Sequence, residues 1–190
     1  WYDQSGNGND ATQLTAGSQP KIVDAGVLVS DGIEFDGVDG HFDFSSGNPI
    51  TSIDAASAFF VGSSDSSSAQ CGINLSQSAS QRFYLPIMNS GNFRFGYADS
   101  LTAVTFASSN TSEHLFTGIA GASTTSGYYD GELKGTVSSG TGVSGSGEIG
   151  SIGSIYRWDG RIREIIIYDS DQSANRPAIE ANINNQYDIY

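Results

Sequence analysis

Short apolar runs that alternate with polar residues recur along the whole chain and restrict it to a β fold. In Asn92–Tyr97 the three aromatic residues occupy every second position, as on one face of a strand. Ile33–Asp36 and His41–Phe44 alternate in the same way, and Gly37–Gly40 between them supplies turn residues for a hairpin. About a dozen such runs are present. We therefore expect an all-β, two-sheet antiparallel β-sandwich of the jelly-roll type, with residues 1–190 forming a single domain.

The end of the chain departs from this β pattern. Arg161–Tyr168 is rich in β-branched residues and is expected to form the last strand. After it, apolar residues recur at every fourth position, as on one stripe of a helix: Ile179, Ile183 and Tyr187. Asn175 stands where it can cap such a helix, and Pro177 stands in the first turn, where its missing N–H costs little. One short C-terminal helix is therefore expected.

Composition and charge narrow the class of protein. The chain has 190 residues, 37% of them hydrophobic, which is enough for one domain with a sizeable core. A formal net charge of −13 repels phosphate backbones, so we expect no nucleic-acid binding; neutral sugars, basic partners or calcium are compatible with it. Cys71 is the single cysteine, and no apolar run is long enough to insert into a membrane. Trp1 and Tyr2 read as mid-strand residues, so we expect a domain excised from a longer protein.

Three blocks of the sequence resemble the concanavalin A-like, laminin G-like jelly-roll family. The first joins Asp3–Thr12 to Ile33–Gly40, the second is Tyr128–Glu132, and the third combines Gly160–Tyr168 with the terminal helix. They follow one another in the family's order and at roughly its spacing, so the resemblance covers the whole chain. It implies a lectin-like β-sandwich that recognises a cell-surface glycan or an extracellular polysaccharide.

The closing strand and helix also resemble those of laminin G-like domains in bacteriophage structural proteins such as tail fibres. This narrower resemblance implies an extracellular or virion-surface location, a role in host attachment, and a homo-oligomer formed through the parent protein. The chain departs from the family at Ile166, where members often carry a polar residue. Either both faces of this strand are covered by the other sheet and the helix, or Ile166 belongs to a subunit contact.

The sequence lacks the motifs of the enzymes that share this fold. Glycoside hydrolysis needs two carboxylates flanking the sugar bond, and the family's hydrolases carry them as Glu-x-Asp-x-x-Glu on one strand face. No such segment occurs here, and neither His41 nor His114 follows the Gln-x-His pattern of the lyases. We therefore expect no enzyme, although carboxylates from separate strands could still be brought together.

Aromatic and polar residues near the expected loops are candidates for sugar binding, because aromatic rings pack on C–H surfaces and polar neighbours bond the hydroxyls. The candidate ligand-binding residues are Trp158, Tyr156, Arg157, Tyr128 and Tyr97. Trp158 ranks first because it adjoins the Asp159–Gly160 turn between two arginines. Core packing or a strand-end role is the alternative for each candidate, and Trp1 and Tyr2 are expected to cover a sheet edge.

Calcium is the cofactor that the resemblance suggests. Asp3–Asp10 is rich in Asp, Asn and Gly but does not follow the EF-hand pattern. In related folds a structural calcium joins the N-terminal loop to the last strand, which implies Asp3, Asn9 and Asp169 as ligands here. Asp36 and Asp39 form a second candidate pair. Ordinary hydrogen bonding within Asx turns is the alternative.

These observations favour a non-catalytic carbohydrate-recognition or adhesion domain. Two alternatives stay open: a structural knob or decoration module for virion assembly that binds no glycan, and a glycan-cleaving enzyme. The enzyme would need two carboxyl groups within catalytic reach in a groove.

Overall fold

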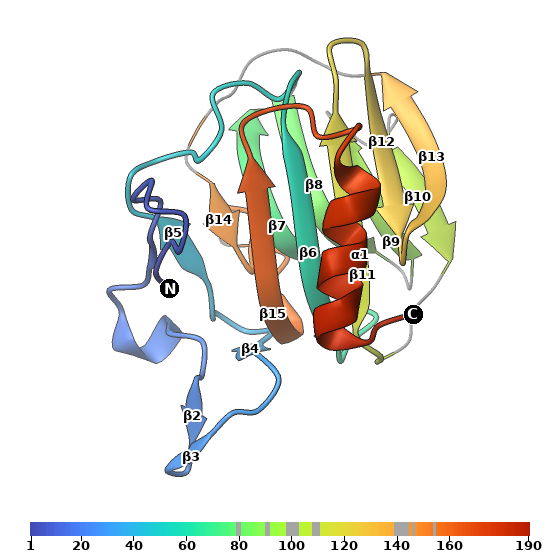
Figure 1. Cartoon of the computed structure of the whole chain (residues 1–190). Helices are drawn as coiled ribbons and strands as arrows, with labels where there is room; N and C mark the ends of the chain where they lie inside the picture. Colours follow the sequence, from blue (N-terminus) through green and yellow to red (C-terminus); the bar gives the residue numbers. More distant parts are fainter. Residues whose placement is uncertain are drawn as a thin grey trace.

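The computed structural model describes residues 1–78, 81–89, 92–97, 103–107, 111–138, 145, 147–153 and 155–190. Within them the chain forms two large antiparallel sheets, packed face to face, and a helix at the C-terminal end (Figure 1). The expected jelly-roll β-sandwich with a C-terminal helix is confirmed. Among the described residues, no helix is both long enough and apolar enough to cross a membrane.

Each sheet gathers strands from distant parts of the sequence. In spatial order the seven-stranded sheet contains β1 (Ala11–Thr12), β5 (Phe42–Phe44), β14 (Glu148–Ile149), β7 (Gln70–Ser78), β8 (Gln81–Asn89), β9 (Asn92–Tyr97) and β10 (Ala103–Ala107). The six-stranded sheet contains β13 (Glu132–Ser138), β12 (Thr124–Tyr129), β11 (His114–Ala120), β6 (Ser57–Ser64), β15 (Asp159–Tyr168) and β4 (Ile33–Asp36). A small hairpin of β2 (Val23–Asp24) and β3 (Val27–Leu28), a 3-10 turn (Ala16–Ser18) and the helix α1 (Arg176–Tyr187) complete the elements.

The hairpin expected between residues 33 and 44 is wrong. Both runs are strands, but β4 pairs with β15 and β5 pairs with β1 and β14, so the two strands belong to different sheets. The turn between them is real: one oxygen of the Asp36 carboxylate accepts the N–H groups of Val38, Asp39 and Gly40. The turn residues predicted a change of chain direction, but each strand has a partner more than a hundred residues away, β15 for β4 and β14 for β5. The turn at Asp130–Gly131, by contrast, does join the paired strands β12 and β13.

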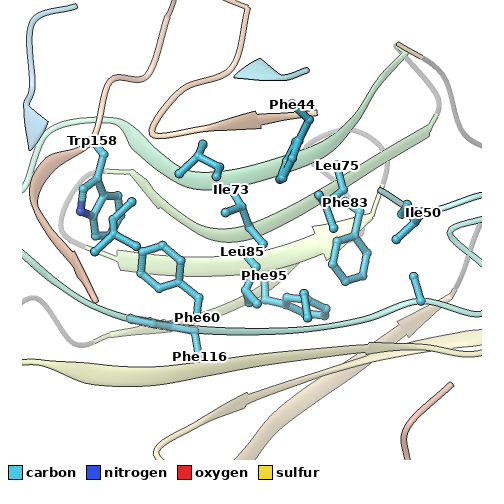
Figure 2. Packing of buried hydrophobic residues seen from close by; sticks show 14 of the residues in the cluster. Phe44, Ile50, Phe60, Ile73, Leu75, Phe83, Leu85, Phe95, Phe116 and Trp158 are labelled. Carbon is cyan, nitrogen blue, oxygen red and sulfur yellow. The ribbon is translucent and has the colours of Figure 1, made fainter. Parts of the chain in front are cut away.

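Aromatic side chains fill the space between the two sheets (Figure 2). The ring of Phe60 on β6 meets Phe116 edge-on at 6.0 Å and Trp158 at 5.3 Å between centroids, and Phe93 lies 4.7 Å from Phe116. Edge-to-face pairs of this kind add about 0.5–1.5 kcal/mol each to the gain from burial. On β11, Gly118 provides the space for Phe95, because a Cβ at that position would overlap the ring.

The helix α1 covers the outer face of the six-stranded sheet (Figure 1). Its expected stripe is confirmed: Ile183 is buried and Ile179 and Tyr187 pack beside it. Ile166 of β15 lies in this helix-covered cluster, whereas Ile165 and Ile167 pack toward the inter-sheet core. The run of three isoleucines therefore has both of its faces covered, as the first of the two readings of Ile166 expected.

The start of α1 differs in one detail from the expectation. Pro177 does lie in the first turn, but the Asn175 side chain donates to Gln172 instead of capping the helix. The Asn175 backbone is already helical, with φ −95° and ψ −14°, whereas side-chain capping favours an extended residue at this position.

The stability of the helix–sheet contact should fall as pH rises. Glu180 of α1 is 3% exposed, and burial raises the pKa of its carboxyl. Hydrogen bonding by Thr117 and the charge of Arg176 offset this rise only in part. The folded state then holds this proton more tightly than the unfolded state. The unfolding free energy decreases as pH rises from the ordinary glutamate pKa through the raised value. Glu180→Gln should remove this decrease in urea unfolding series across pH. Glu132→Gln, an exposed change on β13, is the matched control. Identical pH profiles for the parent and Glu180→Gln would contradict the assignment.

Candidate functional site

Trp158, the first-ranked ligand residue, lies in the core. Its indole is 0% exposed and packs on Phe60 between the sheets. Its backbone is fixed on both sides, because its N–H donates to the Gly150 carbonyl at 2.9 Å and its carbonyl accepts the Gly37 N–H at 2.9 Å. A ring without exposed surface cannot stack on a sugar, so the expected ligand contact of Trp158 is wrong, and its role is to anchor the chain that enters β15.

The residues immediately before Trp158 stay at the surface. We call Ile155, Tyr156 and Arg157 the Tyr156 turn. Ile155 is 57% exposed and Tyr156 is 38% exposed. The Tyr156 backbone has φ +54°, and the Cys71 N–H holds it by donating to the Tyr156 carbonyl at 2.8 Å. A bulky residue in the left-handed region is an outlier that costs about 1–2 kcal/mol, and such strain concentrates at functional sites.

Arg157 carries donors that the fold does not use. Its Nε and Nη1 atoms are buried and have no hydrogen-bond partner among the residues that the structure describes, and the same is true of the Trp158 Nε1 atom. A buried donor without an acceptor costs about 1–3 kcal/mol. The guanidinium is a planar fork that matches paired oxygen atoms. The Tyr156 turn thus places an exposed aromatic ring beside unused donors.

The other two predicted ligand residues lie elsewhere. Tyr128 packs in the helix-covered cluster, with the Arg176 guanidinium 3.9 Å from the centre of its ring. Tyr97 ends β9 opposite Phe83, and its side chain lies outside the described part of the structure. Of the five candidates, Tyr156 is therefore the exposed one, and its neighbour in sequence, Arg157, is half-buried with two guanidinium nitrogens inside the fold.

Sequence reasoning missed a cleft of about 430 Å³ between the N-terminal loop and the second half of β15. Its inner side is largely apolar and its rim is polar. The inner side includes Trp1, Ala11, Phe44, Ile149, Ile165 and Ile167; the rim includes Asp3, Gln4, Asn7, Glu164, Asp169 and Tyr187. The signal in the sequence was a mismatch of lengths, because the ten-residue run of β15 adjoins the four-residue run of β4.

Hydrogen bonds within the N-terminal loop hold the wall of the cleft opposite β15. The Asp3 carboxylate accepts the Ser5 N–H at 2.8 Å and the Asn9 N–H at 3.0 Å. Hydrogen bonding from the Ser5 side chain, followed by the backbone N–H groups of Asn9 and Ser5, lowers the Asp3 pKa. Trp1 and Ala11 exchange backbone hydrogen bonds of 2.7 and 2.8 Å. Trp1 therefore lies beside Ala11 of β1, the edge strand of the seven-stranded sheet.

Asp3, Asn9 and Asp169, the expected calcium ligands, all line this cleft. Their side chains are already engaged: Asp3 binds its own loop, and Asp169 accepts the Thr51 N–H at 2.7 Å and the Thr51 hydroxyl at 2.8 Å. No group of three or more His, Cys, Asp or Glu residues within the described ranges could hold a metal ion. The carboxylates of Asp3 and Asp169 are thus held by protein donors, and calcium binding stays a sequence-based prediction.

The second candidate pair for calcium is also occupied. The Asp36 carboxylate accepts three backbone N–H groups of its own turn, and Asp39 Oδ2 accepts the Ser18 hydroxyl at 3.1 Å. Asp36 acts as the ordinary turn-forming group that the alternative expected, whereas Asp39 links this turn to Ser18.

Comparisons with known proteins support the fold. No family model matches the sequence, and no curated protein matches it. Among solved structures, domain 4 of AbnA, an extracellular arabinanase from Geobacillus stearothermophilus in complex with arabinotriose, has 14% identity and a TM-score of 0.71 and covers 94% of this chain and 91% of its own. The CBM40 of a Ruminococcus gnavus sialidase, bound to α2,3-sialyllactose, has 17% identity, a TM-score of 0.58 and coverage of 77% and 94%.

A third similar structure is the LG4-5 pair of the mouse laminin α1 chain, with 12% identity and a TM-score of 0.53. The match covers 84% of this chain and 48% of the laminin fragment, so this chain spans about half of that fragment. At such low identity these likenesses show the fold alone: the chain has the jelly-roll β-sandwich that occurs among carbohydrate-binding and laminin G domains.

Metal removal tests the calcium assignment. We expect the melting temperature of the domain to be the same in CaCl₂ and in EDTA, because the carboxylates of Asp3 and Asp169 are held by protein donors. Differential scanning calorimetry of the parent and of Asp169→Asn measures this. A calcium-dependent rise in the parent that the variant lacks would contradict the expectation and place a metal in the cleft.

Proposed function

We propose that this domain recognises carbohydrate without catalysis and that the Tyr156 turn is its sugar-binding site. The observation that carries the proposal is the exposed Tyr156 side chain, held in a strained backbone conformation directly before Arg157, whose half-buried guanidinium has two nitrogens without a partner in the described part of the chain. The fold supports the proposal, because jelly-roll domains described with arabinotriose and with sialyllactose share it.

The chemistry of the turn suits a neutral polysaccharide. The face of an aromatic ring packs on the C–H surface of a sugar, and a guanidinium can donate to two neighbouring hydroxyl oxygens. The net charge of −13 disfavours a polyanionic chain. Two side chains on an open turn provide a small contact, so affinity for one domain is modest and repeated copies in an oligomer would supply avidity.

The proposal also concerns the kind of protein to which the domain belongs. The resemblance of the closing strand and helix to those of phage structural proteins supports a virion or surface-adhesion protein that attaches to host or extracellular polysaccharide. A knob or decoration module for virion assembly is the second candidate. The uneven pairing of β15 favours that candidate, because a strand edge without a partner is suited to contact with another polypeptide.

Binding to a panel of immobilised polysaccharides tests the sugar assignment. The domain is displayed on a streptavidin tetramer for avidity, and bound protein is measured by fluorescence. Arg157→Gln should weaken binding to the selected polysaccharide by about tenfold or more, because charged hydrogen bonds contribute about 1.5–3 kcal/mol.

Tyr156→Gly should abolish binding while leaving the unfolding free energy unchanged or raising it by up to about 1 kcal/mol, because glycine relieves the left-handed strain.

Tyr2→Ala is the matched control, because this tyrosine is 78% exposed at the rim of the cleft and away from the turn. It should bind like the parent. Failure of every polysaccharide to retain the tetramer, or retention that is unchanged in both turn variants, would contradict the proposal. Release of reducing ends from the panel would favour the enzyme instead.

A further inference from the structure

The two halves of β15 differ in their neighbours. Along the side opposite β6, residues Asp159–Ile162 pair with β4. The ladder with β6 continues to Tyr168, so within the described ranges the segment Arg163–Tyr168 has a strand on one side only. We call Arg163–Tyr168 the open edge.

Local geometry explains why pairing with β4 stops at Ile162. Gly32 has φ +120°, and a Cβ there would lie 2.6 Å from the Ile162 carbonyl oxygen and 3.1 Å from the Arg163 Cα, so a glycine is needed where the chain before β4 passes this close to β15. Arg163 is the extra residue of a bulge in the ladder with β6, and its guanidinium donates to Asp31 at 2.6 Å and Glu113 at 2.7 Å. The bulge and these ion pairs lie at Arg163, directly after the half of β15 that pairs with β4, and the open edge begins at this residue.

The open edge presents unpaired backbone groups to the cleft. In an antiparallel ladder alternate residues direct their N–H and C=O groups away from the partner, so about half of the residues in the open edge face away from β6. The cleft lies against Arg163, Glu164, Ile165, Ile166 and Ile167. An extended polypeptide matches the spacing of such a row of donors and acceptors, which is how strands add to exposed sheet edges.

Side chains along the open edge point alternately toward the inter-sheet core and toward the outer face of the sheet. Toward the inter-sheet core, Ile165 and Ile167 are half-buried, and Trp1 on the edge of the other sheet packs on the same core. The apolar interior of the sandwich thus reaches the cleft on this side. An apolar side chain placed there would lengthen the core between the two sheets.

On the outer side of the open edge, the carboxyl of Glu164 stands beside the apolar Ile166, which packs under α1. Burial raises the pKa of the Glu164 carboxyl, which forms a hydrogen bond with Tyr187 of α1. Asp3 and Asp169 stand on the rim of the same cleft, while the Arg163 charge is already paired with Asp31 and Glu113. This side favours neutral or basic residues.

We propose that the open edge binds an extended polypeptide strand that continues the line of β4 along β15. The strand carries apolar residues at alternate positions, which face the inter-sheet core beside Ile165 and Ile167. Neutral or basic residues occupy the positions between them and face Glu164 and Tyr187. A second copy of the domain is disfavoured as the occupant, because each copy carries a net charge of −13 and the N-terminal loop stands over the edge.

A synthetic peptide tests this proposal with the domain as it stands. The peptide is as long as the open edge and has valine at alternate positions, with lysine and threonine between them. Titration calorimetry should detect binding, and amide hydrogen exchange should show added protection within Arg163–Tyr168. Replacing its lysines by glutamates should weaken binding by about tenfold or more, because the outer rim is acidic.

N-methylation distinguishes strand pairing from contact through side chains. One peptide is methylated on one alternate set of amides and a second peptide on the other set. We expect one methylated peptide to lose binding and the other to keep it, since only one set donates to β15. Equal affinity of both methylated peptides, or exchange of the open edge that no peptide slows, would overturn the proposal.

The test is independent of the sugar site. Tyr156→Gly and Arg157→Gln should bind the peptide like the parent, so loss of sugar binding in those variants leaves this inference unaffected. A different result would overturn the strand assignment: amide hydrogen exchange in the open edge is slowed by a neutral polysaccharide and not by the peptide. The sugar site would then lie in the cleft.

Discussion

The strand β15 has both faces packed between layers of side chains, and the rest of the fold depends on this arrangement. Its isoleucines alternate between the inter-sheet core and the cluster under α1. Because the side-chain period of a strand is two, a shift of one residue would exchange the two sets and expose both layers. The register of β15 on β6 therefore fixes the position of the helix as well as that of the sandwich.

The same strand connects the core to the two surfaces where we infer binding. At its start, the buried Trp158 anchors the chain against Phe60, and the preceding Tyr156 is exposed while Arg157 is half-buried. At its other end, the loss of β4 as a partner leaves the open edge beside the N-terminal loop. One well-packed strand thus presents a polar turn at one end and unpaired backbone at the other.

Periodicity predicted the features that depend on local sequence. The alternation in β9, the β-branched run of β15 and the fourfold spacing on α1 each imply a face. Phe93 and Phe95 of β9 are buried, and the isoleucines of β15 and the stripe of α1 pack in the two apolar clusters. The hairpin between β4 and β5 failed because turn residues show where a chain bends and not which strands it joins. The exposure expected for Trp158 failed because its neighbours form a turn, while its indole contacts come from residues far away in the sequence. The cleft depends on the unequal lengths of strands distant in sequence, which no single segment reveals.

The most direct test of this account measures amide hydrogen exchange along β15 by NMR in the free domain. The account predicts protection of every amide that faces β6 or β4, and exchange at least about tenfold faster at alternate amides within Arg163–Tyr168, where no partner strand is present. Uniform protection from Asp159 through Tyr168 would contradict it, because the second half of the strand would then already be covered.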